Sequence, residues 1–344
     1  MTFLITGGSG FLGSHITAEL LRRGVSVRLL VRDPQRARRA LEPLADGAAG
    51  VPMALGDVTD PASVAAALRG CAGVLHAASV YSFDPRRHAE LRAVNRRGTE
   101  VVLAAARDAG VGRVVHVSTF GALLPAAGPI TSDAPVGAPR EPYLASKAAA
   151  DRVARQHRRD GLPVIITYPP ALLGPHDPRL GDQTRRLRDV LRGLMPIWPD
   201  GGFPIGDVRD AAVRHADVLT RGGPAHVAAP GRFVGTRELL RALREVTNRR
   251  LPAVHLPASA LLPVGRLAGL AQRVLPVHVP VEYGAIYACK VARPLDDAPV
   301  SRSLVDTLAD TVHWLHEAGH LSAAQAGRAA TRKQVGFGIR TTEE

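Results

Sequence analysis

Thr2-Phe-Leu-Ile-Thr6-Gly7-Gly8-Ser9-Gly10-Phe11-Leu12-Gly13 joins a short apolar run to the start of a helical pattern, with glycines at positions 7, 10 and 13. In this spacing Gly7 allows a tight turn, Gly10 lets the backbone approach a pyrophosphate, and Gly13 lets helix and strand pack closely. The N–H groups at the helix start, which include those of Phe11 and Leu12, then face the anion. A glycine pattern in this place predicts a dinucleotide-binding turn.

Apolar runs typical of buried strands alternate with amphipathic helical patterns through the first half of the chain. This alternation indicates βαβ units and a parallel sheet with helices on both faces. Because crossovers in such sheets are right-handed, the simplest α/β topology is the doubly wound Rossmann fold. The strands are expected at residues 2–6, 26–31, 51–55, 73–76, 113–117 and 163–168. The helices are expected at residues 11–23, 34–41, 61–69, 85–109 and 143–160.

After residue 168 the alternation ends, and prolines and glycines become frequent. We expect helices at residues 236–247, 258–274 and 303–318, and one return to the sheet near residues 206–219. The chain therefore divides into a Rossmann domain, residues 1–168 plus about 206–228, and a smaller, mostly helical substrate-binding lobe, residues 169–205 and 229–327. Residues 328–344 show no periodicity and are expected to form a mobile tail.

The end of the second expected strand bears on the choice of cofactor. It reads Val31-Arg32, with no carboxylate at its tip. A carboxylate there would bind both ribose hydroxyls and select NAD, whereas an arginine can bind the 2′-phosphate of NADP. Asp33 complicates this choice, although it can serve as the N-cap of the helix that Pro34 begins. The sequence favours NADP(H), with NAD(H) as the alternative.

Three more residues are expected beside the cofactor. Asp57 and Val58 follow the third strand and would lie near the adenine, whose amine the carboxylate of Asp57 could bind. Asp57 could equally cap its own loop. Ala77 ends the fourth strand, where a small residue leaves space for the cofactor, although it could be plain packing.

Tyr143 and Lys147 carry the sharpest chemical signal, because residues i and i+4 of a helix share a face. A lysine cation is expected to lower the pKa of a nearby phenol, and the same lysine can bind the nicotinamide ribose. Tyr143 can then exchange a proton with a carbonyl oxygen as hydride moves to or from the carbon. The alternative is an ordinary helix in which this tyrosine and this lysine have no catalytic role.

Two hydroxyls end the buried strand that precedes this helix, those of Ser118 and Thr119. A hydroxyl at this point can donate a hydrogen bond to the substrate oxygen and steady the charge that develops on it. Thr119 is the first candidate for this role and Ser118 the second. The alternative is a hydroxyl that satisfies the local backbone.

The motifs occur in the order seen in the extended short-chain dehydrogenases, the NAD-dependent epimerase/dehydratase group, which the chain resembles over about residues 1–225 and more weakly over 293–320. The resemblance implies a seven-stranded Rossmann domain with a C-terminal substrate lobe, and it suggests a homodimer. It also implies that Tyr143 and Lys147 are the catalytic pair, Thr119 the catalytic hydroxyl and Asn95 the asparagine behind the site. The motifs are TGGSGFLG (6–13), GDVTD (56–60), HAAS (76–79), VNRRGT (94–99), VHVST (115–119), YLASK (143–147) and GDVRDAA (206–212).

The segment after the sixth strand distinguishes branches of this family. Nucleotide-sugar epimerases usually carry an arginine and an asparagine there, but this chain has no such arginine and has Tyr168 in the place of the asparagine. The chain is more similar to the dihydroflavonol-reductase and 3β-hydroxysteroid-dehydrogenase-like branch. That branch usually keeps the asparagine before the proline, so Tyr168 departs from its pattern next to Pro169, the expected nicotinamide contact.

Composition excludes several other classes of protein. The net charge of +13 comes almost entirely from scattered arginines without a nucleic-acid-binding motif, so it suits an anionic ligand such as a phosphorylated cofactor better than a nucleic acid. Two cysteines provide neither a disulfide framework nor a metal site, and no metal is expected. The first strand leaves no room for a signal peptide, and residues 251–288 are too often interrupted to span a membrane. We therefore expect a cytoplasmic protein.

The leading hypothesis is an NADPH-dependent carbonyl reductase, or alcohol dehydrogenase in the reverse direction, that acts on a fairly apolar small molecule. The Leu-, Val- and Pro-rich residues 251–281 suit an apolar pocket, though an ordinary helical core looks the same. One alternative is a nucleotide-sugar epimerase or dehydratase that holds NAD tightly and does not consume it. The other is an NADP-binding sensor without turnover, which would not need Tyr143 and Lys147.

Overall fold

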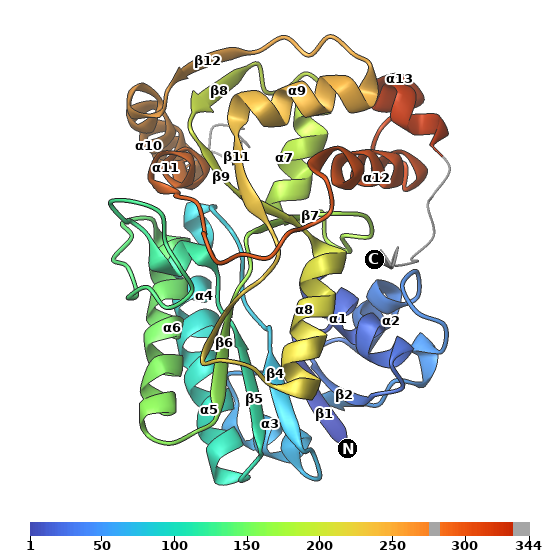
Figure 1. Cartoon of the computed structure of the whole chain (residues 1–344), viewed down its shortest axis with the longest axis vertical. Helices are drawn as coiled ribbons and strands as arrows, with labels where there is room; N and C mark the ends of the chain where they lie inside the picture. Colours follow the sequence, from blue (N-terminus) through green and yellow to red (C-terminus); the bar gives the residue numbers. More distant parts are fainter. Residues whose placement is uncertain (275–282, 333–344) are drawn as a thin grey trace, which may run out of the picture.

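The computed structural model describes residues 1–274 and 283–332 of the 344-residue chain. Figure 1 shows two parts that follow one another along the long axis. The parallel sheet and its helices lie below, and a lobe of helices and short strands lies above. The predicted fold class, a doubly wound Rossmann sheet with a largely helical C-terminal lobe, is confirmed.

Seven parallel strands form the central sheet, in the order β10-β6-β5-β4-β1-β2-β3. The order of the strands reverses between β1 and β4, and ligands of such sheets bind outside the carboxyl ends of the strands at this switch point. The strands are β1 (Thr2–Thr6), β2 (Ser26–Val31), β3 (Met53–Leu55), β4 (Gly73–His76), β5 (Arg113–Val117), β6 (Val164–Tyr168) and β10 (His226–Ala228).

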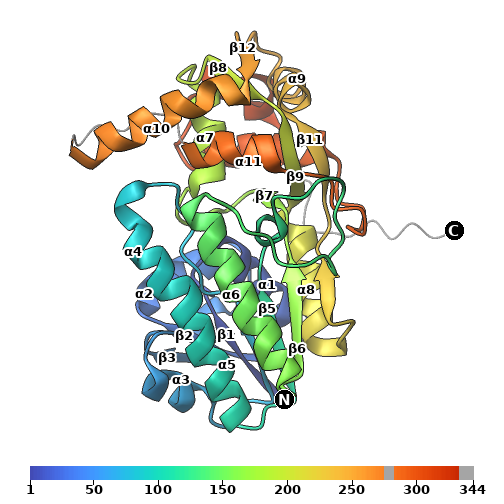
Figure 2. The same ribbon diagram turned by 90° about the vertical axis from the view of Figure 1, so that its left-hand side faces the viewer.

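Helices cover both faces of this sheet (Figures 1 and 2). Successive strand residues point to opposite faces, so Leu4 of β1 packs with α3, α5 and α6, whereas Ile5 packs with α1, α2 and α8. The strands are therefore buried on both sides, which explains their continuous apolar sequences. These helices are α1 (Phe11–Arg22), α2 (Pro34–Leu41), α3 (Pro61–Leu68), α5 (Gly98–Asp108), α6 (Pro142–Arg159) and α8 (Val208–Arg221).

The lobe contains two small sheets that the sequence did not predict. One has the order β11-β9-β7 and the other pairs β12 with β8. Their strands are β7 (Ala171–Leu173), β8 (Ile197–Asp200), β9 (Gly202–Asp207), β11 (Arg232–Gly235) and β12 (Val254–Pro257). The expected lobe helices are present, and the full set is α7 (Asp182–Leu191), α9 (Thr236–Thr247), α10 (Ala258–Val274), α11 (Tyr283–Val291), α12 (Leu304–Glu317) and α13 (Ala323–Ala326).

Three expectations about secondary structure are wrong. The helix expected over residues 85–109 is broken into a 3₁₀ turn, α4 (His88–Leu91), a π-helix (Arg92–Arg97) and α5. The return to the sheet is β10 and not residues 206–219, which form the end of β9 and most of α8, because the Asp207 carboxylate caps a helix there. The tail begins later than expected, since residues 327–331 form a 3₁₀ helix with Ala329 buried; residues 333–344 lie outside the described part.

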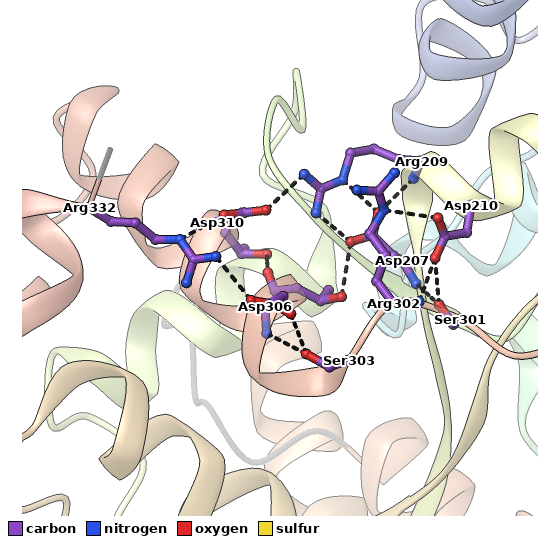
Figure 3. A network of polar contacts seen from close by, with 11 residues as sticks. Asp207, Arg209, Asp210, Ser301, Arg302, Ser303, Asp306, Asp310 and Arg332 are labelled. Atoms are coloured by element: carbon purple, nitrogen blue, oxygen red, sulfur yellow. Dashed lines mark hydrogen bonds and ion pairs between the residues drawn. The ribbon is translucent and has the colours of Figure 1, made fainter. Parts of the chain in front are cut away.

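A buried charge network ties the Rossmann domain to the lobe (Figure 3). The carboxylate of Asp207 accepts hydrogen bonds from Nε and Nη2 of Arg209, at 2.9 and 2.6 Å, and from Oγ1 of Thr307 on α12 at 2.9 Å. Arg209 also donates to Asp310 of α12 at 2.8 Å. The start of α8 is thus bonded to α12, and Arg332, 3.1 Å from Asp310, extends the network to the chain beyond the lobe helices.

We expect Asp207→Asn to lower the free energy of unfolding by roughly 3 kcal/mol, because Arg209 would keep its buried charge without its two-point carboxylate partner. Urea denaturation measures the change. Asp200→Asn is the matched control, since Asp200 pairs with Arg237 on the surface and should contribute less than about 1 kcal/mol. Equal effects of the two substitutions would contradict this assignment.

Candidate active site

A cavity of about 1090 Å³ lies at the carboxyl edge of the sheet and extends into the lobe. Each strand from β1 to β6 is followed, one or two residues after its end, by a residue that lines the cavity. This is the arrangement expected for a ligand site at the switch point of the sheet. These residues are Gly7, Arg32, Asp57, Ala77, Thr119 and Pro169.

The glycine-rich turn forms one end of the cavity. Gly7 has a positive φ of 77°, and a Cβ there would lie 2.6 Å from the backbone of Ala77. A Cβ on Gly13 would overlap the carbonyl oxygen of Gly7, so α1 packs directly on the turn. Gly10 is the N-cap of α1 without a side-chain cap, and no acidic residue lies in the first turn. The helix start, with Phe11 and Leu12 in the cavity wall, therefore fits a cofactor pyrophosphate.

The residues after β2 and β3 face each other at this end. Nη1 of Arg32 lies 3.6 Å from Oδ2 of Asp57, and Oδ1 of Asp57 accepts from the backbone N–H of Thr59 at 2.8 Å. Burial opposes ionisation of Asp57, but the hydrogen bonds from Thr59 and the charge of Arg32 outweigh it and lower its pKa. Asp57 thus caps its own loop, which was one of its two expected roles. Val58 beside it is buried and also lines the cavity.

Asp33 uses its carboxylate within its own helix. Its Oδ1 accepts from the backbone N–H of Arg36 at 3.0 Å, as the N-cap of α2. The side chains of Arg32 and Arg36 line the same part of the cavity. Arg32 and Arg36 therefore line the cavity together with Asp33, one of whose carboxylate oxygens caps α2.

Tyr143 and Lys147 both line the cavity, from the first two turns of α6. Nζ of Lys147 donates to the carbonyl oxygen of Val117 at 3.0 Å. The ring of Tyr143 packs edge-on against Tyr81 and Phe83, at centroid distances of 4.7 and 5.8 Å. One helix face therefore brings the phenol and the ammonium group to the same cavity.

The pKa values of this pair differ from expectation in one respect. Burial lowers the pKa of Lys147 to about 8, against the opposing charge of Asp151. Burial also raises the pKa of Tyr143 well above its ordinary value, and Tyr81, Glu141 and Asp182 raise it further. The predicted lowering of the Tyr143 pKa by Lys147 is therefore not observed. The phenol stays protonated at neutral pH, which is the form that donates a proton.

The two candidate hydroxyls after β5 have different partners. Both residues line the cavity, but Ser118 donates its hydroxyl to Oδ2 of the buried Asp151 at 2.5 Å. Oγ1 of Thr119 accepts from the backbone N–H of Gly121 at 3.2 Å, and Thr119 lines the cavity, so its O–H can be donated to a substrate oxygen. This arrangement favours Thr119 over Ser118 for a substrate contact.

Asn95 is buried in the π-helix and does not line the cavity. Its Oδ1 accepts from the backbone N–H of Val80 at 2.7 Å, and its Nδ2 donates to the hydroxyl of Ser146 at 2.9 Å. Asn95 thus holds the segment after β4 against α6 and positions Tyr81 beside Tyr143.

Tyr168 belongs to a buried cluster that the sequence did not reveal. Its hydroxyl accepts from Nη2 of Arg155 at 2.8 Å, and Nε of Arg155 donates to Asp151, also at 2.8 Å. Tyr168 is fully buried behind the site, while Pro169 next to it lines the cavity. The spacing of Asp151, four residues after Lys147 on α6, is the signal that could have identified it.

The lobe side of the cavity is mainly apolar. Tyr81 and Phe83, which were not predicted from the sequence, also line the cavity and pack against Tyr143. Their position after the HAAS motif, in a chain with only 4% aromatic residues, was the available signal. Prominent members of the wall are Trp198, Phe203, Leu239, Leu261, Ile286 and Cys289.

In the described ranges, no group of three or more His, Cys, Asp or Glu side chains is arranged to hold a metal ion. Among the helices of the same residues, none combines the length and the apolar character that crossing a membrane requires.

Comparison with known proteins places these features in a wider context. Residues 3–226 match the model of the NAD dependent epimerase/dehydratase family. The chain is 30% identical over 314 residues to the 4-hydroxy-2-methyl-3-oxo-4-farnesyl-3,4-dihydroquinoline-1-oxide ketoreductase of Stigmatella aurantiaca, covering 88% of this chain and 91% of the relative. It is 27% identical over 341 residues to a putative dihydroflavonol 4-reductase of Synechocystis, covering 93% and 96%. The crystal structure of gox2253 superposes with a TM-score of 0.75 at 27% identity, over 93% of this chain and 99% of that one.

We expect Gly13→Ala to weaken binding of NADPH and NADH by at least about 100-fold, because the added methyl group would push α1 away from the turn that holds the phosphates. Titration of nicotinamide fluorescence with purified protein measures both affinities. Gly112→Ala is the matched control, since a Cβ at Gly112 meets nothing within 4 Å. Wild-type affinity in Gly13→Ala would show that the turn is not the phosphate site.

Proposed function

Because the chain belongs to the NAD-dependent epimerase/dehydratase family, and is thus an NAD(P)-dependent oxidoreductase of the extended short-chain type, we propose that it uses NADPH to reduce the carbonyl group of a fairly apolar small molecule. The observation that carries this proposal is the continuity of one cavity. Tyr143 and Lys147 lie between the dinucleotide turn at one end and the apolar lobe wall at the other.

The roles of the residues follow from their places along the cavity. A reduced nicotinamide cofactor, when bound, supplies the hydride. The turn from Gly7 to Gly13 holds its phosphates, and the Lys147 ammonium group binds the nicotinamide ribose. Tyr143 donates its phenolic proton to the carbonyl oxygen, while the O–H of Thr119 donates a hydrogen bond to the same oxygen.

Two features support NADPH over NADH as the cofactor. Arg32 and Arg36 line the cavity next to the place where the adenosine ribose would lie. The nearest carboxylate on the same strand end, that of Asp33, accepts the backbone N–H of Arg36 through Oδ1 as the cap of α2, so one of its two oxygens is already engaged. A guanidinium group binds a phosphate with charge-assisted hydrogen bonds, so this end suits a 2′-phosphate.

The substrate end supports an apolar carbonyl compound. Its wall offers mainly aliphatic and aromatic side chains, and the polar lobe residues Asp182 and Gln183 are bonded to the segment of Tyr81 and Phe83. The name of the Stigmatella relative describes a ketoreductase whose substrate bears a 3-oxo group and a farnesyl chain. Reduction of a ketone with an apolar substituent is therefore the reaction that we assign to this chain.

We expect Tyr143→Phe to lower kcat/KM for NADPH-dependent ketone reduction by about 10²- to 10⁴-fold, because the proton donor is lost. The affinity for NADPH should stay unchanged, since the phenol is not needed to hold the phosphates. Turnover is followed by the absorbance of reduced nicotinamide with a panel of apolar ketones and nucleotide sugars. Retention of full activity would remove the assigned role. Co-purified NAD with turnover of nucleotide sugars alone would favour an epimerase or dehydratase.

We expect Arg32→Ala to weaken NADPH binding by about 10- to 100-fold and to leave NADH binding unchanged, because only the 2′-phosphate distinguishes the two cofactors. Titration of each cofactor measures this difference. Arg39→Ala is the matched control, as Arg39 lies on α2, which begins two residues after Arg32, but outside the cavity. A parallel loss of both affinities would contradict the role of Arg32 in cofactor choice.

A further inference from the structure

Arg179 reaches from the lobe to the dinucleotide turn. It lies in the segment between β7 and α7, lines the cavity, and donates from Nη2 to the hydroxyl of Ser9 at 3.1 Å. Ser9 belongs to the glycine-rich turn, so this contact joins residues 170 positions apart in the sequence. A lobe residue therefore stands over the place where the cofactor phosphates are expected.

The guanidinium group of Arg179 lies near more cations than anions, with Asp177 as the carboxylate whose charge opposes theirs. Partial burial lowers its pKa, and the charges of Arg36, Arg32 and Arg87 lower it further. Arg32 and Arg87 have carboxylate partners in Asp57 and Glu90. Among residues 1–274 and 283–332, by contrast, no carboxylate lies within ion-pair distance of the Arg179 guanidinium. Like charges held together at a cavity mouth repel one another, and an anion among them relieves this repulsion.

The loop that carries Arg179 is held in a fixed conformation. The buried carboxylate of Asp177 accepts from the backbone N–H groups of Arg179 and Gly181, and from the hydroxyl of Thr184. His176 and Leu180 have positive φ angles of 60° and 45°, which residues other than glycine rarely adopt. Such strained residues persist where the surrounding structure determines them, and they cluster at ligand clamps. The guanidinium is therefore presented to the turn in advance of ligand binding.

We propose that Arg179 is a phosphate ligand of the dinucleotide cofactor, supplied by the substrate lobe across the cavity from the glycine-rich turn. The inference rests on the proposed function only in taking the cofactor to occupy this cavity. In this proposal the hydroxyl of Ser9 accepts the hydrogen bond from Arg179 that a phosphate oxygen of the bound cofactor would accept instead. The phosphate is either the pyrophosphate, shared by both cofactors, or the 2′-phosphate of NADPH.

This contact links cofactor binding to the substrate wall. Three residues after Arg179, the carboxylate of Asp182 accepts from the backbone N–H of Phe83 at 3.2 Å, and Gln183 donates to the hydroxyl of Tyr81 at 3.2 Å. Tyr81 and Phe83 are the rings packed against Tyr143. A phosphate bound by Arg179 would therefore contact the same segment whose continuation, the start of α7, holds the aromatic side chains around the proton donor.

The test is the affinity of Arg179→Ala for NADPH and for NADH, measured by nicotinamide fluorescence without any substrate. We expect a loss of about 10- to 100-fold, the usual size of a charge-assisted hydrogen bond to an anion. The affinity should also fall less steeply with added salt than in the wild type, because one cationic contact is missing. A loss for both cofactors assigns the pyrophosphate; a loss for NADPH alone assigns the 2′-phosphate.

Two controls make the result decisive. Arg237→Ala removes another exposed lobe arginine, one that pairs with Asp200 and does not line the cavity, and should bind both cofactors normally. The melting temperature of cofactor-free Arg179→Ala should match that of the wild type. Unchanged affinities and salt dependence in Arg179→Ala overturn the inference. If the wild-type protein binds NADPH but reduces no ketone, the proposed function is contradicted. The role of Arg179 in cofactor binding is then still decided by the affinities of Arg179→Ala.

Discussion

All seven strands of the central sheet run in the same direction, and this constraint brings the loops that follow them to one edge. The cavity is built at that edge because the residues after six of the strands meet there. A parallel sheet also requires helical crossovers, and the first of these begins at Gly10, where the start of α1 faces the cavity. The direction of the strands thus fixes where the phosphates, the proton donor and the substrate wall lie relative to one another.

One face of α6 carries the chemistry and its support. Tyr143, Lys147, Asp151 and Arg155 recur at intervals of four residues, which places them along a single stripe of the helix. The first two face the cavity, and the last two form the buried cluster with Tyr168 behind it. Asp151 opposes the effect of burial on Lys147. The helix therefore supplies both a reactive pair and the counter-charge that keeps a cation tolerable inside the protein.

The sequence predicted those parts of the fold and the site that depend on local patterns. β1, β2, β4 and β5 occupy the residues expected, since continuous apolar runs between turn residues leave little choice of strand position. The π-helix in residues 92–97 escaped prediction because one extra residue per turn does not disturb the apolar pattern enough to be seen. Residues 206–219 were misassigned because the helix there is started by the cap of Asp207, a contact that the apolar pattern does not show.

The parts of the site that local patterns missed arise from contacts between distant segments. The raised pKa of Tyr143 depends on its burial and on the charges of Tyr81, Glu141 and Asp182, none of which the YxxxK spacing reveals. The place of Ser118 depends in the same way on Asp151, 33 positions later. The resemblance to the extended short-chain dehydrogenases gave the expected roles, and the folded chain shows which side chains surround them.

Trp198 gives the substrate wall a property that no other part of the cavity has. The protein contains only two tryptophans, and both Trp198 and Trp314 belong to the lobe, while the Rossmann domain has none. The indole of Trp198 is buried in the cavity wall, whereas Trp314 lies on α12. The tryptophan emission of the protein therefore originates entirely from the lobe, and it provides a built-in optical reporter of events at the substrate end that needs no attached dye.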